Sequence, residues 1–292
     1  MKVLICYFSG TNNTKKIVDR YCQSFEDNGV ECDLHKIEND EFDKNIEDYD
    51  MLGIAYPVHA FNAPSIVLEF AKKLPEASKK VFIAKTSGEP LKLNNISSLK
   101  LIKLLKKKGY SVENEYHYCM PYNIIFRHTD DMAYRMWESA KAVVPIDCKS
   151  ILDGKKEKLD GVFMGSLLAW IFRIEFWGGR FNGKRYKVSD ECVHCNRCIK
   201  TCPTKNITIE NGEFKFGDKC IMCMRCSFFC PKNAIKIGLF NKWRVNGPYH
   251  FQKPEKEEEN KHKNYCKKSY KKYFEKCQAK VDAEKENLEK VG

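Results

Sequence analysis

Residues 192–203 read Cys192-Val-His-Cys195-Asn-Arg-Cys198-Ile-Lys-Thr-Cys202-Pro203, and residues 220–231 read Cys220-Ile-Met-Cys223-Met-Arg-Cys226-Ser-Phe-Phe-Cys230-Pro231. Both runs have the spacing C-x2-C-x2-C-x3-C-P, and together they hold eight of the 15 cysteines. A fixed, repeated spacing of thiol side chains is typical of a metal-binding module. This stretch therefore decides the fold of the C-terminal part of the chain.

The cysteine spacing predicts two [4Fe–4S] clusters. The first three thiolates of a run hold one cube, and the fourth is carried to the cube of the other run. Two structural zinc sites are the alternative, but they leave the third cysteine of each triplet and both Cys-Pro pairs unexplained. The predicted ligands of cluster one are Cys192, Cys195, Cys198 and Cys230, and those of cluster two are Cys220, Cys223, Cys226 and Cys202.

This stretch resembles bacterial two-cluster ferredoxins, and the resemblance implies a small α+β domain over residues 184–240. Two local patterns agree with it. Residues 207–210 and 213–216 alternate about Asn211-Gly212, which is a strong hairpin signal. Residues 186–188 and 235–237 are the expected second pair of strands.

The N-terminal part alternates strands with helices. Apolar or alternating runs predict strands at 2–8, 30–36, 49–56, 81–85 and 111–119, and helical periodicity predicts helices at 15–25, 65–74, 96–108 and 131–144. Such alternation favours an α/β fold, a doubly wound parallel sheet with helices on both faces. Ligands of these sheets bind where loops leave the carboxyl ends of the strands.

The loop after the first strand reads Ser9-Gly10-Thr11-Asn12-Asn13-Thr14 and precedes a helix. Hydroxyls beside a helix N-terminus can hold a phosphate, although an ordinary N-cap by Thr11 or Asn12 is the alternative. The order of strand, loop and helix resembles flavodoxins, whose loop has the pattern S/T-x-T-G-N-T. Here Asn12 replaces the glycine, and asparagine adopts left-handed backbone more readily than most residues.

The resemblance to flavodoxins implies an FMN site over residues 1–150. Its phosphate contacts would be Ser9, Thr11, Asn12, Asn13 and Thr14. Two further loops would flank the flavin ring, namely Pro57, Val58, His59, Ala60, Phe61 and Asn62, and Thr86, Ser87, Gly88 and Glu89. His59 and Phe61 are the only aromatic candidates in these loops for stacking on the ring, and ordinary loop packing is the alternative for each.

The net charge of +12 lies almost wholly in the C-terminal part, because residues 1–183 carry only +1. Each oxidised cluster with its four thiolates adds about −2 and offsets much of this excess. No nucleic-acid motif or basic patch interleaved with aromatics accompanies the charge, so nucleic acid is not an expected partner.

Residues 151–183 are expected to connect the two domains. The run 162–177 is the most apolar in the chain, but its 16 residues include Arg173 and Glu175 and fall short of the roughly 20 that a membrane span needs. It is predicted to be a packing helix between the domains, with membrane-surface contact or partner docking as alternatives. The charged tail 241–292 is predicted to be solvated helix or disorder, and Cys266 and Cys277 within it have no identified partners.

These features lead to one functional hypothesis and two alternatives. The chain resembles flavodoxin–ferredoxin fusions of anaerobes, which implies electron transfer between FMN, two [4Fe–4S] clusters and a redox protein partner. A flavin-dependent oxidoreductase of a small substrate, fed by the clusters, is the first alternative, and a redox sensor or structural module is the second. The N-terminus begins with a strand and shows no signal-peptide pattern, so a reducing, cytoplasmic location is expected.

Overall fold

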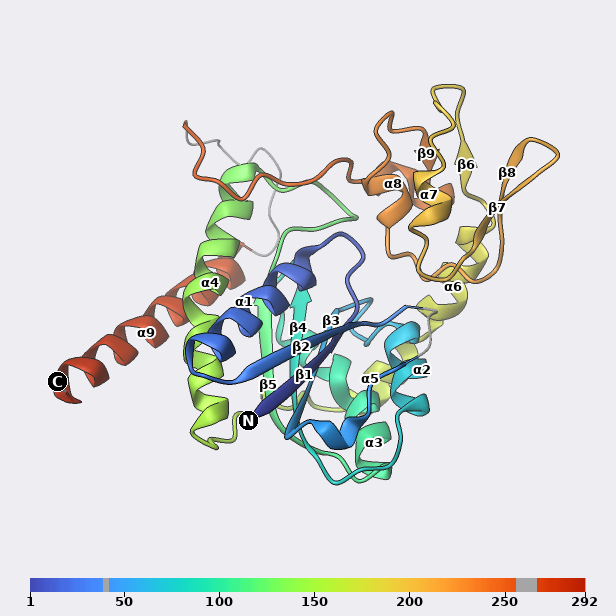
Figure 1. Ribbon diagram of the computed structural model, residues 1–292. Helices are drawn as coiled ribbons and strands as arrows, with labels where there is room; N and C mark the ends of the chain where they lie inside the picture. The colour runs from blue at the N-terminus through green and yellow to red at the C-terminus, as the bar shows by residue number, and fades with distance from the viewer. Residues whose placement is uncertain (39–41, 256–266, 292) are drawn as a thin grey trace.

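The computed structural model describes residues 1–38, 42–255 and 267–291, and its N-terminal domain is built on a five-stranded parallel sheet (Figure 1). The order in space is β2-β1-β3-β4-β5. This is the strand order of flavodoxin-like doubly wound folds, so the predicted fold class is confirmed. The strands are β1 (Lys2–Tyr7), β2 (Glu31–Lys36), β3 (Met51–Pro57), β4 (Lys80–Ser87) and β5 (Ser111–Cys119).

Helices cover both faces of this sheet. One face packs against α1 (Asn13–Asp27) and α4 (Asp130–Leu152), and the other against α2 (Ser65–Lys73) and α3 (Leu99–Lys107). The central strands are therefore buried on both sides, which explains their continuous apolar sequences. Short 3-10 helices occur at η1 (Ile46–Asp48), η2 (Lys92–Ser98) and η3 (Gly238–Trp243).

Helix α4 is longer than its predicted range of 131–144. It begins after Thr129, whose side chain accepts a hydrogen bond from the Met132 backbone, and it continues past Pro145 to Leu152. A proline inside a helix costs about 3 kcal/mol. Cys148 and Ile151 beyond it are buried against the sheet, so tertiary packing overrides that local penalty.

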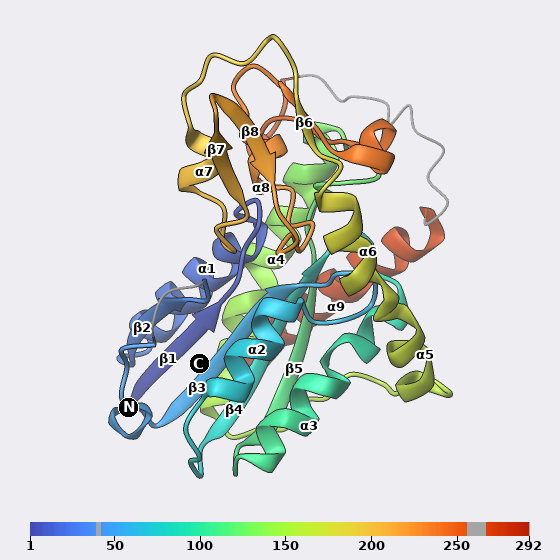
Figure 2. The ribbon, with the colours of Figure 1, turned by 90° about the vertical axis from the view of Figure 1, so that its right-hand side faces the viewer.

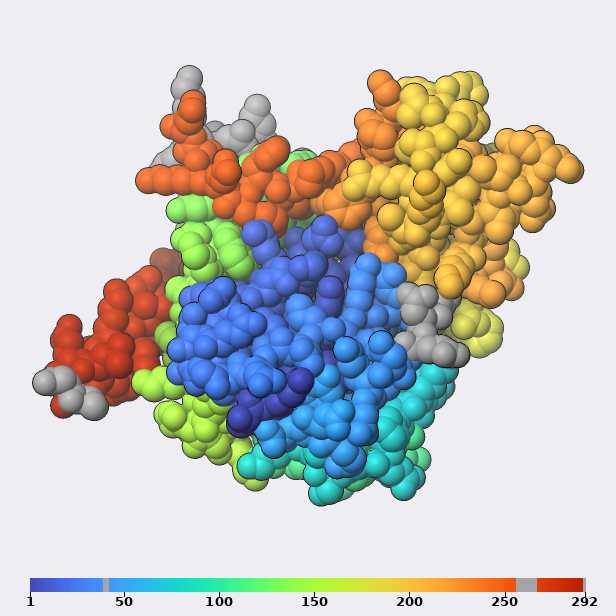
Figure 3. Space-filling view, in the orientation of Figure 1, coloured from blue at the N-terminus to red at the C-terminus, as the bar shows by residue number. Residues whose placement is uncertain are grey.

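The cysteine-rich module lies over the carboxyl ends of the parallel strands, where Arg225 contacts the loop after β1 (Figure 2). In the space-filling view it is the gold and orange part above the blue N-terminal part (Figure 3). It contains two antiparallel pairs, β6 (Lys187–Val188) with β9 (Ile235–Lys236), and β7 (Ile207–Glu210) with β8 (Glu213–Phe216). Both predicted strand pairs are present. Asn211 and Gly212 at the hairpin turn have φ of 50° and 81°, as a type I′ turn requires. Two short helices, α7 (Arg197–Lys200) and α8 (Arg225–Phe228), each contain the third cysteine of a run.

The connecting segment forms α5 (Gly165–Phe172) and α6 (Ile174–Gly183), which run along one edge of the molecule from η2 to the module (Figure 2). The segment forms two helices in place of the single packing helix predicted for 162–177, and only one of its sides is packed. Phe163, Trp170, Ile174 and Trp177 are exposed on the other side. Among the helices that the structure describes, none has the length and hydropathy required to cross a membrane.

The end of the chain forms a long helix, α9 (Lys267–Val291), that lies along α4. It is not solvated on all sides, because Tyr270 is buried and Tyr273 and Phe274 pack against a cluster that includes Met136 of α4. Cys277 is partly buried in the same interface, and burial raises the pKa of its thiol to about 11. Cys266 lies outside the described residues.

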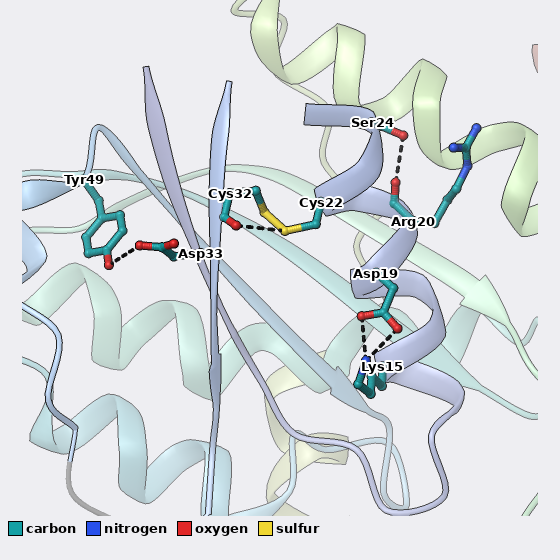
Figure 4. The surroundings of a disulfide bond; sticks show 8 residues. All are labelled: Lys15, Asp19, Arg20, Cys22, Ser24, Cys32, Asp33 and Tyr49. Atoms are coloured by element: carbon teal, nitrogen blue, oxygen red, sulfur yellow. Dashed lines mark hydrogen bonds and ion pairs between the residues drawn. A yellow bond between two sulfur atoms is a disulfide. The ribbon is translucent and has the colours of Figure 1, made fainter. Parts of the chain in front are cut away.

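A disulfide joins Cys22 of α1 to Cys32 of β2 (Figure 4). Nothing in the sequence pattern predicts this bond, and the expected reducing environment disfavours disulfides. The two cysteines lie on different elements, and only the packing of α1 beside β2 brings their Cα atoms to 5.3 Å. That separation is ordinary for a disulfide.

Candidate cofactor sites

A cavity of about 400 Å³ opens at the carboxyl edge of the sheet, between the N-terminal domain and the cysteine module. Its volume lies in the range of about 300–1,000 Å³ that is usual for sites of small ligands and cofactors. The walls come from the loops that follow β1, β3, β4 and β5, from α6, and from the module itself. The topology of the sheet therefore brings together loops that are far apart in the sequence.

The hydroxyl-rich loop forms one wall of this cavity. Of the five residues predicted to contact phosphate, Ser9, Thr11, Asn13 and Thr14 line the cavity and Asn12 does not. Asn12 instead adopts a left-handed conformation, with φ of 70°, at the turn into α1. The start of α1 and the Ser9 and Thr11 hydroxyls then face the cavity together, which is the chemistry that a phosphate requires.

The second and third predicted loops form further walls. Residues 57–61 and 86–89 all line the cavity, whereas Asn62 is buried behind its loop and donates from its side chain to the Ala60 carbonyl oxygen at 3.2 Å. Between the first and third loops, the Thr14 and Thr86 hydroxyl oxygens are 2.8 Å apart. Thirteen of the fifteen predicted residues therefore line the cavity, and Asn12 and Asn62 do not.

His59 and Phe61 each line the cavity and also have packing roles. Burial lowers the pKa of His59 to about 4, only partly offset by a hydrogen bond to the backbone of Ile221, so its ring is neutral at pH 7. The Phe61 ring lies 4.8 Å from that of Phe172 of α5. Ordinary loop packing, the alternative to stacking on a flavin ring, therefore accounts for part of the contacts of each side chain.

Three aromatic cavity residues were missed by the sequence analysis, namely Tyr122, Phe240 and Trp243. Tyr122 follows β5, so its position after the last parallel strand could have identified it as a candidate cavity residue from the sequence. Its hydroxyl donates to Glu89 Oε2 at 2.5 Å, and a Cβ at Gly88 would collide with its ring. Phe240 and Trp243 lie beyond the cysteine module in the sequence, and no local pattern pointed to them.

The wall that faces the connecting segment carries a second carboxylate. Glu175, Gly178 and Gly179 of α6 line the cavity, and burial raises the pKa of Glu175 to about 7. This side chain can therefore hold or release a proton near neutral pH. Met222 of the module completes this side of the cavity.

The eight cysteines of the two runs line two small cavities. One cavity is lined by Cys192, Cys195, Cys198, Cys226 and Cys230, and the other by Cys202, Cys220, Cys223 and Cys226, so Cys226 borders both. Each set of four that the spacing predicts lies among the cysteines of one cavity, and the ligands of each cluster stay a prediction. We call Cys192, Cys195, Cys198 and Cys230 the first cysteine group, and Cys202, Cys220, Cys223 and Cys226 the second.

The two runs also repeat each other in backbone conformation. Left-handed φ angles recur at equivalent positions, which are His194 and Met222, Asn196 and Met224, and Lys205 and Asn233. The resulting turns aim backbone N–H groups at sulfur. The His194 and Met222 amides each donate to the preceding cysteine Sγ at 3.4 Å, and the Asn206 and Ala234 amides donate to Cys202 and Cys230 at 3.3 and 3.2 Å.

The chemistry of the second group of cysteines fits an iron–sulfur cluster. Burial raises the pKa of Cys220 to about 11 and that of Cys223 to about 12. Buried thiolates would thus be unfavourable at neutral pH unless a cation binds them, and iron supplies that charge. The N–H donors to sulfur are of the kind that tune cluster potentials.

Direct contacts join the module to the first loop of the sheet. Arg225 is buried and donates to the Ser9 and Gly10 carbonyl oxygens at 2.7 and 3.2 Å. The same guanidinium bonds Glu38 and the Thr201 carbonyl oxygen, both at 2.7 Å. Gly10 is required at this contact, because a Cβ there would collide with the Cys223 carbonyl oxygen. The loop that borders the cavity therefore touches the second cysteine group.

Comparisons with known proteins treat the two parts separately. Residues 184–231 match the model of the 4Fe-4S dicluster domain, and the comparison with curated proteins finds no match. Among solved structures, oxidised Flavodoxin 2 from Bacillus cereus has 16% identity and a TM-score of 0.40, covering 53% of this chain and 99% of that one. A short-chain flavodoxin associated with a PDU bacterial microcompartment has 13% identity and a TM-score of 0.39, covering 53% of this chain and 98% of that one.

The flavodoxin-like assignment rests on the strand order and on the loops at the carboxyl edge of the sheet. The assignment of the module rests on the family match and on the repeated cysteine spacing. The match of the module to a 4Fe-4S dicluster domain supports a redox role. The chain thus joins a flavodoxin-like domain to a C-terminal 4Fe-4S dicluster domain, in the arrangement of a flavodoxin–ferredoxin fusion.

Proposed function

We propose that the protein transfers electrons between FMN, two [4Fe–4S] clusters and an external redox partner. The observation that carries this proposal is the shared wall of the large cavity. Met222, which lies between Cys220 and Cys223, lines the same cavity as the hydroxyl-rich loop and the loops after β3 and β4. A flavin in this cavity would lie beside the second cysteine group, with no intervening domain.

The arrangement of the two cysteine groups suggests an order of carriers. Cys223 is buried against Gly10, which lines the cavity, so the group with Cys202, Cys220 and Cys226 is the inner of the two. Cys195 of the other group is exposed. We infer that electrons pass from the flavin to the inner group, then to the outer group and then to the partner, or in the reverse direction. When bound, the flavin supplies exchange between one-electron and two-electron transfer.

Residues of the chain have distinct parts in this proposal. Ser9, Thr11 and the start of α1 would bind the phosphate. Glu89 and Tyr122, which are hydrogen-bonded to each other, would set the charge on one side of the cavity. Arg225 would hold the module against the phosphate loop and keep the carriers close.

A reductase of a small substrate is the second candidate function, and Glu175 favours it. This carboxyl lines the cavity with a pKa near neutrality, as a proton donor to a bound substrate would need. Steady turnover of a defined small molecule without another protein would support this candidate. Flavin–cluster transfer without such turnover would support the carrier.

The proposed function is tested by anaerobic reconstitution with flavin, iron and sulfide, followed by quantification and stopped-flow reduction. We expect about one FMN and about eight iron atoms per chain, since each cluster holds four. We also expect cluster bleaching and flavin reduction to be kinetically coupled. A fully reconstituted protein that binds no flavin would contradict the assignment of the cavity.

A further inference from the structure

The connecting segment exposes a stripe of large apolar side chains along α5 and α6. Phe163 is 88% exposed, Trp170 64%, Ile174 74% and Trp177 71%, and Leu167, Ile171 and Phe181 continue the same helical spacing. Contiguous apolar surface of this kind usually marks an interaction site.

The opposite side of this segment is already packed, by small residues. Gly165 lies against Ile96 and Leu99, Gly179 against Met222, and Gly183 against Cys220, where a Cβ would collide. Ala169 is buried on the same side. The small residues on the inner side of the segment thus make its contacts with the rest of the described chain. The large side chains on its outer side are not needed for that packing.

A basic groove of about 350 Å³ lies beside the apolar stripe, between α3 and α5. Its described lining includes four cationic side chains, Lys100, Lys103, Lys107 and Arg173, and no acidic one. The Arg173 Nε is buried and has no hydrogen-bond partner in the described part of the chain. The groove therefore presents a cluster of cationic side chains and, within the described part of the chain, one donor with no acceptor.

More cations lie at the module end of the stripe. The Arg180 guanidinium lies 5.6 Å from the Trp177 ring centroid, and the Arg185 guanidinium 3.5 Å from that of Phe181. Aromatic side chains with Arg and Lys around them are typical of segments that lie in the interface of a lipid bilayer.

We propose that α5, α6 and the basic groove form a docking surface for an anionic phospholipid bilayer. The groove would take a lipid phosphate, and Trp170, Ile174 and Trp177 would enter the interfacial region. An apolar stripe flanked by Lys and Arg side chains suits the interface of a bilayer whose headgroups are negatively charged. Because α6 is also a wall of the large cavity, docking would bring that wall to the membrane.

Vesicle flotation of the reconstituted full chain tests this proposal. We expect binding to vesicles of equal parts phosphatidylglycerol and phosphatidylcholine, and little binding to phosphatidylcholine alone. Raising the salt from about 0.1 to about 0.5 M should weaken the binding, because it screens the cations. The double variant Trp170→Ser/Trp177→Ser should lower the bound fraction roughly tenfold through lost apolar insertion. Lys103→Glu/Lys107→Glu should lower it on anionic vesicles.

The control is Leu288→Ser, which removes a 58% exposed leucine from α9 and should leave binding unchanged. The lysine variant alters two exposed side chains, so it remains informative if the tryptophan variant does not fold. Absence of binding to anionic vesicles would overturn the proposal, as would equal binding by all variants. A dimer in analytical ultracentrifugation that Trp170→Ser/Trp177→Ser dissociates, without vesicle binding, would instead assign the stripe to a second copy of the chain.

Discussion

Arg225 donates from Nη2 to the carbonyl oxygen of Ser9 at 2.7 Å, and this bond ties the cysteine module to the loop that borders the large cavity. We expect Arg225→Met to weaken the contact between the module and this loop by about 3 kcal/mol. The reason is that Glu38 and three carbonyl oxygens each lose a charged hydrogen-bond donor. Flavin affinity and the rate of flavin–cluster transfer should both fall. Flavin titration and stopped-flow spectroscopy measure these changes.

Arg197 provides a matched control, since it occupies the equivalent position in the first cysteine run. It is exposed and lies over the Phe229 ring instead of at the domain contact. Arg197→Met should therefore leave flavin affinity unchanged. Equal losses in the two variants would mean that the arginines act on their nearby clusters and not through the interface.

The sequence could predict those parts of the molecule that depend on local spacing. The alternation of strands and helices predicted the parallel sheet, and Asn211-Gly212 predicted the β7–β8 hairpin, because each pattern acts over a few residues. The loops after β1, β3 and β4 were found for the same reason. Each follows a recognisable buried strand and must reach the same edge of the sheet.

Features that depend on contact between distant segments could not be predicted. Trp243 and Glu175 reach the cavity only because the module folds back over the sheet. The Cys22–Cys32 bond depends on the packing of α1 beside β2. In the connecting segment, apolar composition alone did not distinguish its packed side, which carries Gly165 and Gly179, from its exposed side.

The crossed grouping of the cysteines predicts how single replacements affect the two clusters. Cys230→Ser should remove or alter the outer cluster and leave the inner one, and Cys202→Ser should do the opposite, although both changes are in the last cysteine of a run. Loss of the inner cluster should block transfer from the flavin to the partner entirely. Electron paramagnetic resonance and stopped-flow kinetics distinguish these outcomes. A Cys230→Ser protein that loses the inner signal would contradict the crossed arrangement.

Glu89 predicts an effect on the flavin potential. A carboxylate on the cavity wall disfavours negative charge on the reduced flavin, so Glu89→Gln should raise the midpoint potential. We expect a rise of about 30 mV, equivalent to about 1.4 kcal/mol for two electrons. Glu210→Gln, an exposed change on β7, is the control for potentiometry. No upward shift would indicate that Glu89 has no electrostatic influence on the flavin.

Because of the Cys22–Cys32 disulfide, we expect the free energy of unfolding to depend on the presence of reductant. Cys22→Ser should lower the free energy of unfolding by about 2–3 kcal/mol without reductant, because a cross-link between residues 10 apart restricts the unfolded chain. In the presence of reductant, the variant and the wild type should unfold alike. Urea titrations of both proteins under the two conditions measure the difference. Identical stability without reductant would show that the two thiols are not linked in solution.

The ion pair of Lys280 with Asp147 predicts that the docking of α9 depends on pH. Burial raises the pKa of Asp147 to about 6, opposed by Lys280 and by the Tyr118 hydroxyl, which donates to it at 2.5 Å. Between pH 3.8, the ordinary pKa, and about pH 6, the Asp147 carboxyl is therefore protonated to a greater extent in the folded state than in the unfolded chain. Stability from this group falls as pH rises through that window.

Lys280→Met removes the cation and should raise the pKa of Asp147 further, so the loss of stability extends to higher pH. We expect about 2 kcal/mol of destabilisation at about pH 8 and much less at about pH 5, because breaking a buried pair leaves an uncompensated carboxylate. Adding Asp147→Asn to the Lys280→Met protein should remove this pH dependence of the free energy of unfolding. Lys149→Met is the matched control, since its pair with Glu284 joins the same two helices in a more exposed setting and should contribute under about 1 kcal/mol. Urea unfolding at the two pH values measures all four proteins, and equal destabilisation of Lys280→Met at both would contradict a charged Asp147 as the cause.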